Sequence, residues 1–325
     1  MKRTFYFISL ILTFIVSCNR QSVDFKEVTL NKDTIITQLN DSTFFSDIRS
    51  MFFDKYLYVS DYKRNQIIVL DSKAHVIKTI GMPGRGPGEF QGISHIVVNN
   101  DTIYAQNDGK RCIEILDIDG FIKTVPLKRG IQLQTTSRFS YLNNTFYLSS
   151  VTKENSIVAY DFVSDSIKHL GIINQFANEE YNYYRNERHI FIVESRYIIA
   201  VSHTSPVIEK YDINGNLLEQ FSYKDILPVQ KRIKFIENQQ SEINSVYELI
   251  SDAYIESDKI YLILISNEGN TVSSNRILKI DFRDKMKAAQ LYNLDEGWFS
   301  SICITKEHLW AFDGKGGSLV MFSLK

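Results

Sequence analysis

The chain has 325 residues, with 37 Lys and Arg against 38 Asp and Glu and a formal net charge of −1. Because this balance provides no basic surface for phosphate groups, nucleic acid is excluded as an expected partner. Its 18 Tyr and 21 Phe, its 5 Pro and its short runs of β-branched residues favour strands over helices.

The first 17 residues have the anatomy of an export signal. Lys2 and Arg3 form a positive start, and residues 5–16 form an apolar run that is shorter than a membrane span requires. We therefore expect residues 1–17 to be removed as a signal peptide. Without Lys2 and Arg3, the mature chain has 35 basic against 38 acidic residues.

The signal ends in a cysteine that resembles a lipidation site. Residues 15–18 read Ile-Val-Ser-Cys, which is similar to the lipobox of bacterial lipoproteins, where the cysteine becomes the lipidated first residue. An ordinary cleaved signal with a chance cysteine is the alternative. With Cys18 lipidated and residues 18–25 as a tether, we expect an extracytoplasmic protein, in the periplasm or at the cell surface. Its lipid anchor would be its only contact with the membrane.

A repeated unit follows. An apolar pair that usually contains an aromatic residue recurs six times, with 43 to 63 residues between successive second members. Most pairs follow a tight polar turn. Each pair precedes a second apolar run, which often closes with Asp. In most repeats a third apolar run follows. Four short strands at this spacing are typical of a propeller blade. The six pairs are Leu57 and Tyr58, Ile103 and Tyr104, Phe146 and Tyr147, Tyr197 and Ile198, Ile260 and Tyr261, and Leu309 and Trp310.

The last repeat is one strand short. It ends with the run 319–324, which supplies a third strand, and the N-terminal run 28–39 can supply the fourth. Closing the ring in this way removes exposed sheet edges. The sequence therefore predicts an all-β, six-bladed β-propeller of four-stranded antiparallel blades over residues 26–325, closed by an N-terminal strand. We expect it to be monomeric.

Residues 81–120 resemble an NHL-type repeat of six-bladed propellers. The similarity rests on the glycines at 81, 84, 86 and 88, on Glu89 and Phe90, and on the run Ile115 to Gly120. Blades three to five depart from the repeat, since Ser150 replaces the polar Asp or Asn after the second strand and the glycine-rich loop is absent. The resemblance implies a bacterial propeller lipoprotein, but one scaffold serves many functions.

The long segments between strands all fall at one end of this predicted propeller. Turns between a blade's second and third strands, and between successive blades, share that end in an antiparallel meander. The long segments are 81–92, 171–187, 222–248 and 266–276. Because loops on a rigid frame usually carry binding residues, we expect the ligand at this end.

Several side chains on these segments are candidates for the ligand site. The tyrosines combine apolar area with a polar tip that suits a sugar or a peptide, although packing of the insertion is an equal alternative. Asn107 and Asp108 can instead cap turns. The segment 225–248 can form a short helix or a lid. The loop-end candidates are Arg85, Glu89, Asn107, Asp108, Tyr181, Tyr183 and Tyr184.

A polar position recurs nine residues before the second member of each apolar pair. The two following positions are mostly apolar, so this register predicts a polar ring around the central channel. Four of the six members are basic or can become so, which favours an anionic group at the channel mouth. A solvated funnel is the simpler alternative. The predicted ring is Arg49, His95, Arg138, His189, Asp252 and Ser301.

Signs of catalysis are few. The ring offers only Asp252 as a carboxylate ligand, the six histidines lack metal-binding spacing, and Cys112 and Cys303 fit buried free thiols. We expect no metal and no cofactor. The sequence predicts a binding module whose ligand is an envelope protein, a peptide or a glycan. The alternative is a hydrolase or lyase that holds a small anionic substrate with the four basic members of the ring.

Overall fold

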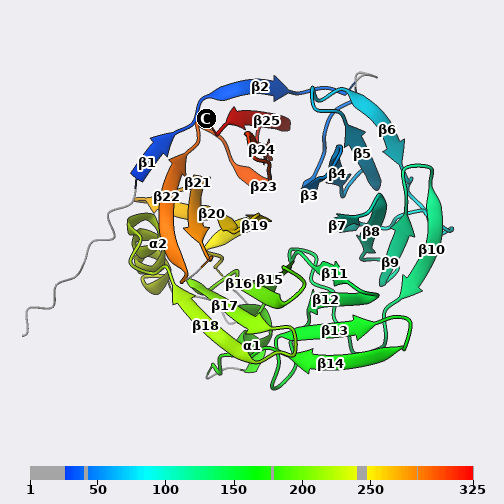
Figure 1. Cartoon of the computed structure of the whole chain (residues 1–325). Helices are drawn as coiled ribbons and strands as arrows, with labels where there is room; N and C mark the ends of the chain where they lie inside the picture. The colour runs from blue at the N-terminus through cyan, green and yellow to red at the C-terminus, as the bar shows by residue number, and fades with distance from the viewer. Residues whose placement is uncertain (1–25, 40–42, 177–178, 240–246, 284, 325) are drawn as a thin grey trace, which may run out of the picture.

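Six small sheets surround a central axis in the computed structural model (Figure 1). The structure describes residues 26–39, 43–176, 179–239, 247–283 and 285–324. The predicted signal peptide, the lipidation site Cys18 and the tether lie outside the described residues. The six-bladed propeller predicted from the sequence is confirmed.

Each of the first four blades is a meander of four antiparallel strands whose first strand faces the axis. Blade 1 has β3 (Ile48–Phe53), β4 (Leu57–Asp61), β5 (Gln66–Leu70) and β6 (Val76–Ile80). Blade 2 has β7 (Ile93–Asn99), β8 (Thr102–Asn107), β9 (Cys112–Leu116) and β10 (Phe121–Pro126). Blade 3 has β11 (Ser140–Leu142), β12 (Thr145–Ser149), β13 (Ile157–Asp161) and β14 (Ser166–Leu170). Blade 4 has β15 (Arg188–Val193), β16 (Tyr197–Ser202), β17 (Val207–Asp212) and β18 (Leu217–Ser222).

The last two blades take up the N-terminal strands, β1 (Lys26–Thr29) and β2 (Lys32–Ile36). Blade 6 has β23 (Phe299–Ile304), β24 (His308–Asp313) and β25 (Ser318–Ser323), and β2 pairs antiparallel with β25 as its predicted fourth strand. Blade 5 has β19 (Ile250–Glu256), β20 (Lys259–Glu268), β21 (Thr271–Asp281) and β22 (Lys287–Asn293). Here β1 adds a fifth strand, parallel to β22, which the sequence pattern did not indicate.

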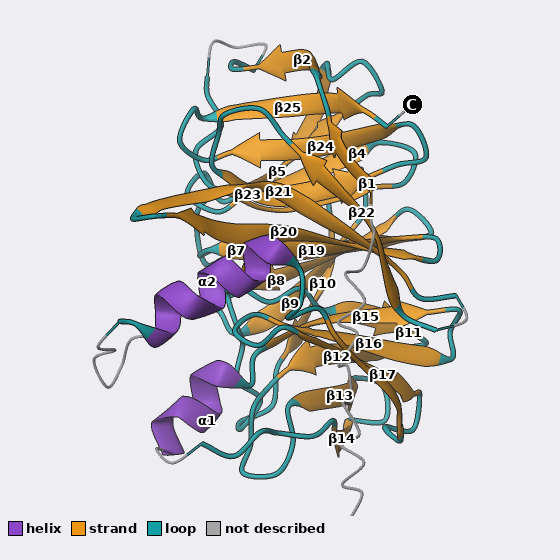
Figure 2. Ribbon diagram, turned by 90° about the vertical axis from the view of Figure 1, so that its left-hand side faces the viewer, coloured by secondary structure: helices purple, strands orange, loops and turns teal. Residues whose placement is uncertain are grey.

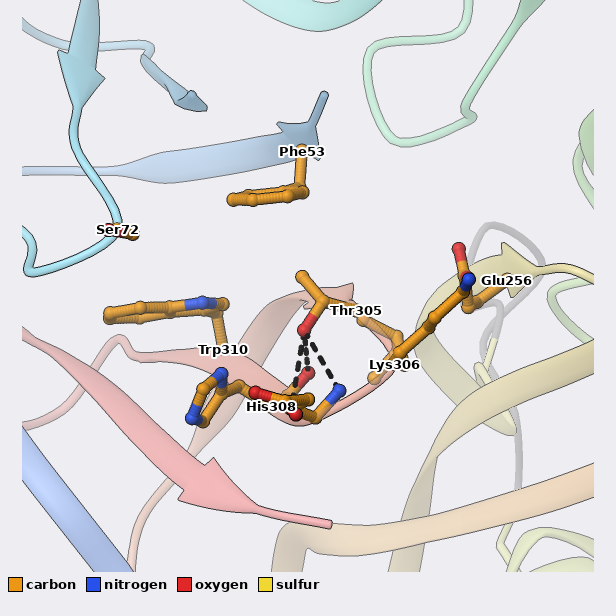
Figure 3. Close-up of a pocket in the computed structure, with 9 residues that line it drawn as sticks. Phe53, Ser72, Glu256, Thr305, Lys306, His308 and Trp310 are labelled. Carbon is orange, nitrogen blue, oxygen red and sulfur yellow. Dashed lines mark hydrogen bonds between the residues drawn. The ribbon is translucent and has the colours of Figure 1, made fainter. Parts of the chain in front are cut away.

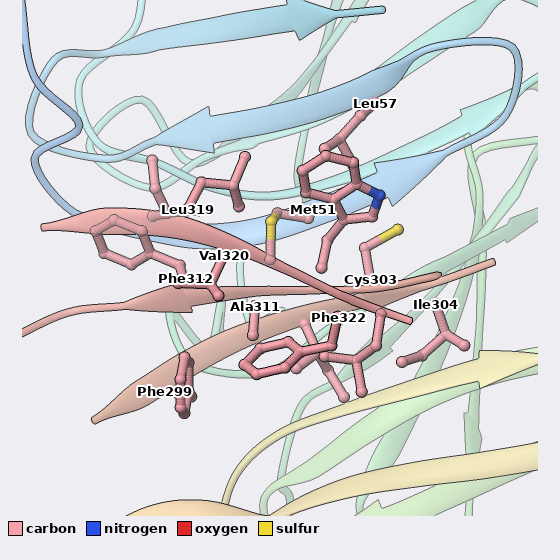
Figure 4. Packing of buried hydrophobic residues seen from close by; sticks show 14 of the residues in the cluster. Met51, Leu57, Phe299, Cys303, Ile304, Ala311, Phe312, Leu319, Val320 and Phe322 are labelled. Atoms are coloured by element: carbon pink, nitrogen blue, oxygen red, sulfur yellow. The ribbon is translucent and has the colours of Figure 1, made fainter. Parts of the chain in front are cut away.

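The core lies between the faces of neighbouring blades. Each predicted apolar pair falls on the second strand of its blade, and its buried side chains pack against the next sheet. The largest cluster joins blades 5, 6 and 1. It includes Met51 and Leu57 of blade 1 and Phe299, Phe312 and Phe322 of blade 6 (Figure 4). Each buried Leu, Met or Phe contributes about 1.5–3 kcal/mol relative to its exposed state. The ring is therefore held together by contacts between blades.

The two ends of the propeller differ in their connections. Two-residue turns such as Asn143 and Asn144, both at positive φ, join strands at the end that we call the hairpin end. The opposite, loop end carries the interblade segments, including α1 (Glu179–Arg185) and α2 (Leu227–Glu237), which lie on the same side of the molecule (Figure 2). Of the short helix or lid considered for 225–248, the structure shows a helix, α2.

One long segment is not a loop. Residues 266–276 continue β20 and β21 as a hairpin with a tight turn at Gly269, so the expectation of a loop there is wrong. The extended hairpin still projects from the loop end and packs against α2 (Figure 2). No helix within the described ranges has the length and hydrophobicity that a membrane crossing needs.

Candidate functional site

A buried ion pair closes the propeller axis. Arg138, just before β11 of blade 3, forms a bidentate pair with Asp252 of blade 5, at 2.7 Å (Nε–Oδ1) and 2.6 Å (Nη2–Oδ2). The guanidinium also donates to the carbonyls of Met51 in blade 1, at 3.1 Å, and Ile302 in blade 6, at 2.8 Å. Because blades 3 and 6 are opposite each other in the ring, the Arg138 side chain crosses the axis.

This guanidinium is fully committed to its partners. Burial alone would lower the pKa of Arg138, but the adjacent Asp252 carboxylate raises it above its usual value. Asp252 also accepts hydrogen bonds from the backbone amides of Ala253 and Ile302, each at 2.8 Å. A buried ion pair needs this complete set of bonds to offset the loss of hydration. Arg138 is therefore a structural tie between blades.

The ring histidines are uncharged. His189 stacks on His203 with ring centroids 4.0 Å apart, and its Nδ1 accepts from the Arg138 backbone amide at 3.2 Å. Burial, and after it the charges of neighbouring groups, lower the pKa of His95 and His189 well below the usual value. Three basic members of the ring, Arg138, His95 and His189, thus offer an anion no free positive charge at neutral pH. The hydrolase or lyase alternative retains only Arg49 as a cation.

A cavity of about 260 Å³, the mouth cavity, opens beside this ion pair at the loop end. Its walls are the first residues of innermost strands and the segments before them. Within it, the Arg49 guanidinium lies 3.9 Å from the Tyr62 ring centroid and 3.2 Å from Asp47 Oδ2. The charged and aromatic side chains that line it are Asp47, Arg49, His95, Glu248, Asp252 and Trp298.

Buried polar atoms without partners lie at this cavity, in His95, and close to it, in Asp108 near Arg49. His95 is 2 % exposed, and neither ring nitrogen has a hydrogen-bond partner within the described ranges, although the Thr135 backbone approaches closely enough to favour its protonated form. Asp108 Oδ1 accepts from Ser94 and Gln106, each at 2.9 Å, whereas Oδ2 has no described partner. Such atoms cost about 1–3 kcal/mol each unless a ligand or water completes their bonds.

Two carboxylates that the sequence did not single out add to the mouth. Glu248 lines the cavity before β19, and Glu187 lies near it, hydrogen-bonded to the Thr136 side chain. Burial, followed by the nearby Glu248 carboxylate, raises the pKa of Glu187 to about 7. Burial also raises the pKa of Glu248, against the effect of Arg232. Their position at the start of innermost strands is the signal that could have identified them.

Three of the predicted loop-end residues shape the segment 81–92. Glu89 Oε2 accepts from the Gly86 amide at 2.6 Å, which closes the glycine-rich turn. Asn107 is fully buried and ties the segment to blade 2, accepting from Gln91 N and donating to the Glu89 carbonyl, both at 3.0 Å. Arg85 is exposed on the turn. The geometry gives Glu89 and Asn107 structural contacts.

The three tyrosines lie on α1, beside a second loop-end cavity of about 620 Å³. Tyr183 lines it together with Phe176, and its hydroxyl accepts from Gln134 Nε2 at 3.0 Å. The Arg185 guanidinium lies over the Tyr181 ring, with its central carbon 4.4 Å from the ring centroid. Tyr184 is 45 % exposed. The helix α1 thus exposes the Tyr184 ring to solvent and contributes Tyr183 to the wall of the cavity.

The hairpin end has a cavity of its own, of about 430 Å³. The rings of Phe53 and Trp310 lie on its opposite sides, and Thr305, Lys306 and His308 form its polar edge (Figure 3). Every residue lining it is described, and none contributes a buried polar atom without a partner. This cavity is larger and more aromatic than the mouth cavity.

Metal ligands and reactive thiols do not gather at these sites. Within the described ranges, no group of three or more His, Cys, Asp or Glu residues is placed to hold a metal ion. Cys112 and Cys303 are buried and unpaired with each other, as predicted. Burial raises the pKa of both thiols to about 12, so neither is a nucleophile at neutral pH.

The fold has a matching family model. A model described as a six-bladed beta-propeller, DUF5128, matches residues 18–269. No functionally curated protein is similar enough in sequence to match the chain.

Solved structures share this architecture at low sequence identity. A DUF4221-family protein from Bacteroides vulgatus is 8 % identical with a TM-score of 0.61, covering 91 % of this chain and 97 % of its own. A protein from Bacteroides fragilis described as exported is 16 % identical with a TM-score of 0.59, covering 92 % and 98 %. Virginiamycin B lyase from Staphylococcus aureus is 12 % identical with a TM-score of 0.52, covering 90 % and 99 %. At these identities the likeness concerns the fold alone.

Proposed function

This chain belongs to the DUF5128 family of six-bladed β-propellers, and on that premise we propose that it is a lipid-anchored binding module of the bacterial envelope. Its ligand is an envelope protein, a peptide or a glycan, bound at the loop end and the mouth cavity. The module acts as a monomer outside the cytoplasm, built from NHL-type repeats and held to the membrane through Cys18.

One observation carries the proposal. The end of the propeller that bears both helices also bears a cavity lined by His95, whose buried ring nitrogens lack described partners, and Asp108 with its unpartnered Oδ2 lies close to Arg49 of the same cavity. Rigid blades fix the positions of these groups, and loops on a rigid frame are the usual place for recognition. A structurally similar protein described as exported supports the location.

Loop-end variants test the binding function. We expect Tyr184→Ala, or replacement of residues 171–187 by a short linker, to weaken capture of the native partner from envelope extract. Tyr184 is 45 % exposed on α1, so its truncation leaves the core intact. Leu218→Ala, at a 54 % exposed position on the outer strand β18, is the matched control. Unchanged capture by both loop-end variants would contradict the proposal.

The anchor has its own test. We expect Cys18→Ala to abolish incorporation of a labelled fatty acid and to release the protein from the membrane fraction. Cys112→Ala is the control, since this thiol is buried in the folded protein. Membrane association that persists in Cys18→Ala would show that the anchor is wrong, independently of the binding site.

A further inference from the structure

The mouth cavity is rich in carboxylates. Asp47, Glu248 and Asp252 line it. Glu187 lies near Glu248 and bonds to Thr136 of the wall, with the Tyr183 hydroxyl also close. The Glu248 carboxylate accepts no hydrogen bond from a described residue, although Arg232 lies near enough to favour its ionised form.

The arginines around the cavity are already engaged. Arg138 is held by the bidentate pair with Asp252, and Arg49 lies between Asp47 and the Tyr62 ring. Arg232 donates through Nε to the Glu248 backbone carbonyl at 3.1 Å and through Nη1 to the Asn267 side chain at 2.9 Å. The carboxylates of Glu187 and Glu248 are thus left without a cation bound directly to them among the described residues.

Apolar and aromatic groups complete the walls. Trp298 is 36 % exposed at the edge of the cavity, while Ile48 and Ile265 are buried behind it. An exposed indole attracts a cation to its face, and isoleucine side chains suit an alkyl stem. At about 260 Å³ the cavity is smaller than those that hold drug-sized ligands, so it fits one small group.

His95 supplies an independent sign of a ligand. It lines the cavity, is 2 % exposed, and has no described hydrogen-bond partner on either ring nitrogen. A neutral imidazole keeps one nitrogen as an acceptor. The Thr135 backbone lies near enough to favour the protonated ring, so it faces the imidazole N–H and leaves the acceptor nitrogen to a ligand. An N–H donor from a bound molecule would satisfy that nitrogen.

We propose that the mouth cavity binds an alkylammonium or guanidinium group through Glu248, Glu187 and His95, with the face of Trp298 against the cation. The source of this group is either a basic side chain of a peptide or a free small amine. The inference rests on the proposed function and specifies the chemistry of its ligand.

Calorimetric titration with four probes tests the chemistry. The amides of Nα-acetyl-lysine and Nα-acetyl-arginine carry a side-chain cation. The amide of Nα-acetyl-norleucine keeps the alkyl stem without the charge, and that of Nα-acetyl-glutamate carries a negative side-chain charge. We expect the cationic probes to bind about tenfold or more tightly than norleucine, and glutamate not to bind. Equal binding of the lysine and norleucine probes would overturn the proposal. Trilysine and putrescine, titrated in parallel, distinguish a peptide from a free amine.

Matched variants locate the binding. Glu248→Gln keeps the shape of the side chain and removes its charge, and we expect about a tenfold or larger loss of lysine-probe affinity. Trp298→Ala should cost about threefold or more. Glu256→Gln is the control, since Glu256 lines the hairpin-end cavity. A loss in Glu256→Gln equal to that in Glu248→Gln would contradict the assignment.

The pH dependence of lysine-probe affinity gives a further test. Because burial raises the pKa of both Glu187 and Glu248, we expect lysine-probe affinity to increase between pH 6 and pH 8, where Glu187 ionises, and Glu187→Gln to reduce this increase. If no cationic probe binds while loop-end variants still lose their envelope partner, the cation site is wrong and the binding module stands. If both fail, the proposed function falls as well.

Discussion

The hairpin-end cavity is larger than the mouth cavity, about 430 Å³ against about 260 Å³, and it is walled by Phe53 and Trp310. Its polar lining atoms nevertheless have partners or reach solvent, whereas the mouth leaves His95 buried without any described partner. The hairpin end is built from tight turns, and the loop end from long segments that bring charged side chains together. The loop end also has the cavity of about 620 Å³ beside α1, but none of its described lining residues has a buried polar atom without a partner. Unsatisfied polar atoms therefore single out the mouth cavity, which cavity size does not.

The largest effect is expected where the mouth meets the core. Arg138→Met leaves Asp252 buried without its counter-charge, and we expect the free energy of unfolding to fall by about 3–5 kcal/mol. Lys259→Met is the hairpin-end control, because Lys259 and its partners Asp258 and Asp281 are each 20–25 % exposed. We expect it to cost about 1 kcal/mol or less in urea denaturation. Equal losses of unfolding free energy in the two variants would show that the pair of Arg138 and Asp252 does not hold the blades together.

Carboxylates at the two ends should respond oppositely to pH. The folded pKa of Glu187 is about 7, raised from 4.5, so between these values the unfolded chain loses a proton that the folded chain keeps. Its contribution to stability therefore falls as pH rises, by up to about 3 kcal/mol above pH 7. Hydrogen bonding to Lys259 lowers the pKa of Asp258 instead, so stability from Asp258 is lost as pH falls.

The measurement is the difference in unfolding free energy between wild type and each variant. It runs from about pH 4 to pH 8 for Glu187→Gln, and from about pH 5 down to pH 2 for Asp258→Asn, because the pKa of Asp258 lies below 3.8. The difference removes the contribution of the buried histidines, whose lowered pKa values make the whole protein less stable in acid. Slopes of the same sign for the two variants would contradict the contrast between the ends.

A smaller contrast exists within the loop end itself. Asn107→Ala removes a fully buried amide that ties the segment 81–92 to blade 2, and we expect a loss of about 1–3 kcal/mol. Arg85→Ala on the exposed turn should change stability by about 0.5 kcal/mol or less. If Asn107→Ala were neutral in thermal denaturation, its role would be in ligand binding and not in structure.

Much of the fold could be predicted from sequence because each blade repeats a local pattern. The apolar pairs place the second strands, and the run 28–39 contains the strand that closes blade 6. The strand β1 escaped prediction because the pattern of the run 28–39 indicates a single strand and blade 5 already has four strands of its own, so no missing strand indicated a fifth. The segment 266–276 is predicted as a long connection between strands, whereas both strands continue through it to a tight turn at Gly269.

The candidate site was only partly predictable. Register alone placed Arg138 and Asp252 near the axis, but their pairing spans 114 residues and removes the cationic character that the composition of the ring suggested. Burial likewise leaves His95 neutral. Glu187 and Glu248 lie near each other because blades 4 and 5 are neighbours in the ring. No local sequence pattern reveals that proximity.

The two tryptophans of the chain report separately on the two ends. Trp298 is 36 % exposed at the mouth, and Trp310 is 3 % exposed beside the hairpin-end cavity. The most direct test is a fluorescence titration of Trp310→Phe and Trp298→Phe with N-acetyl-lysine amide. We predict a saturable change in emission, with protection from acrylamide quenching, when Trp298 is the only tryptophan. A response from Trp310 alone would contradict the account, because it would place the ligand at the hairpin end.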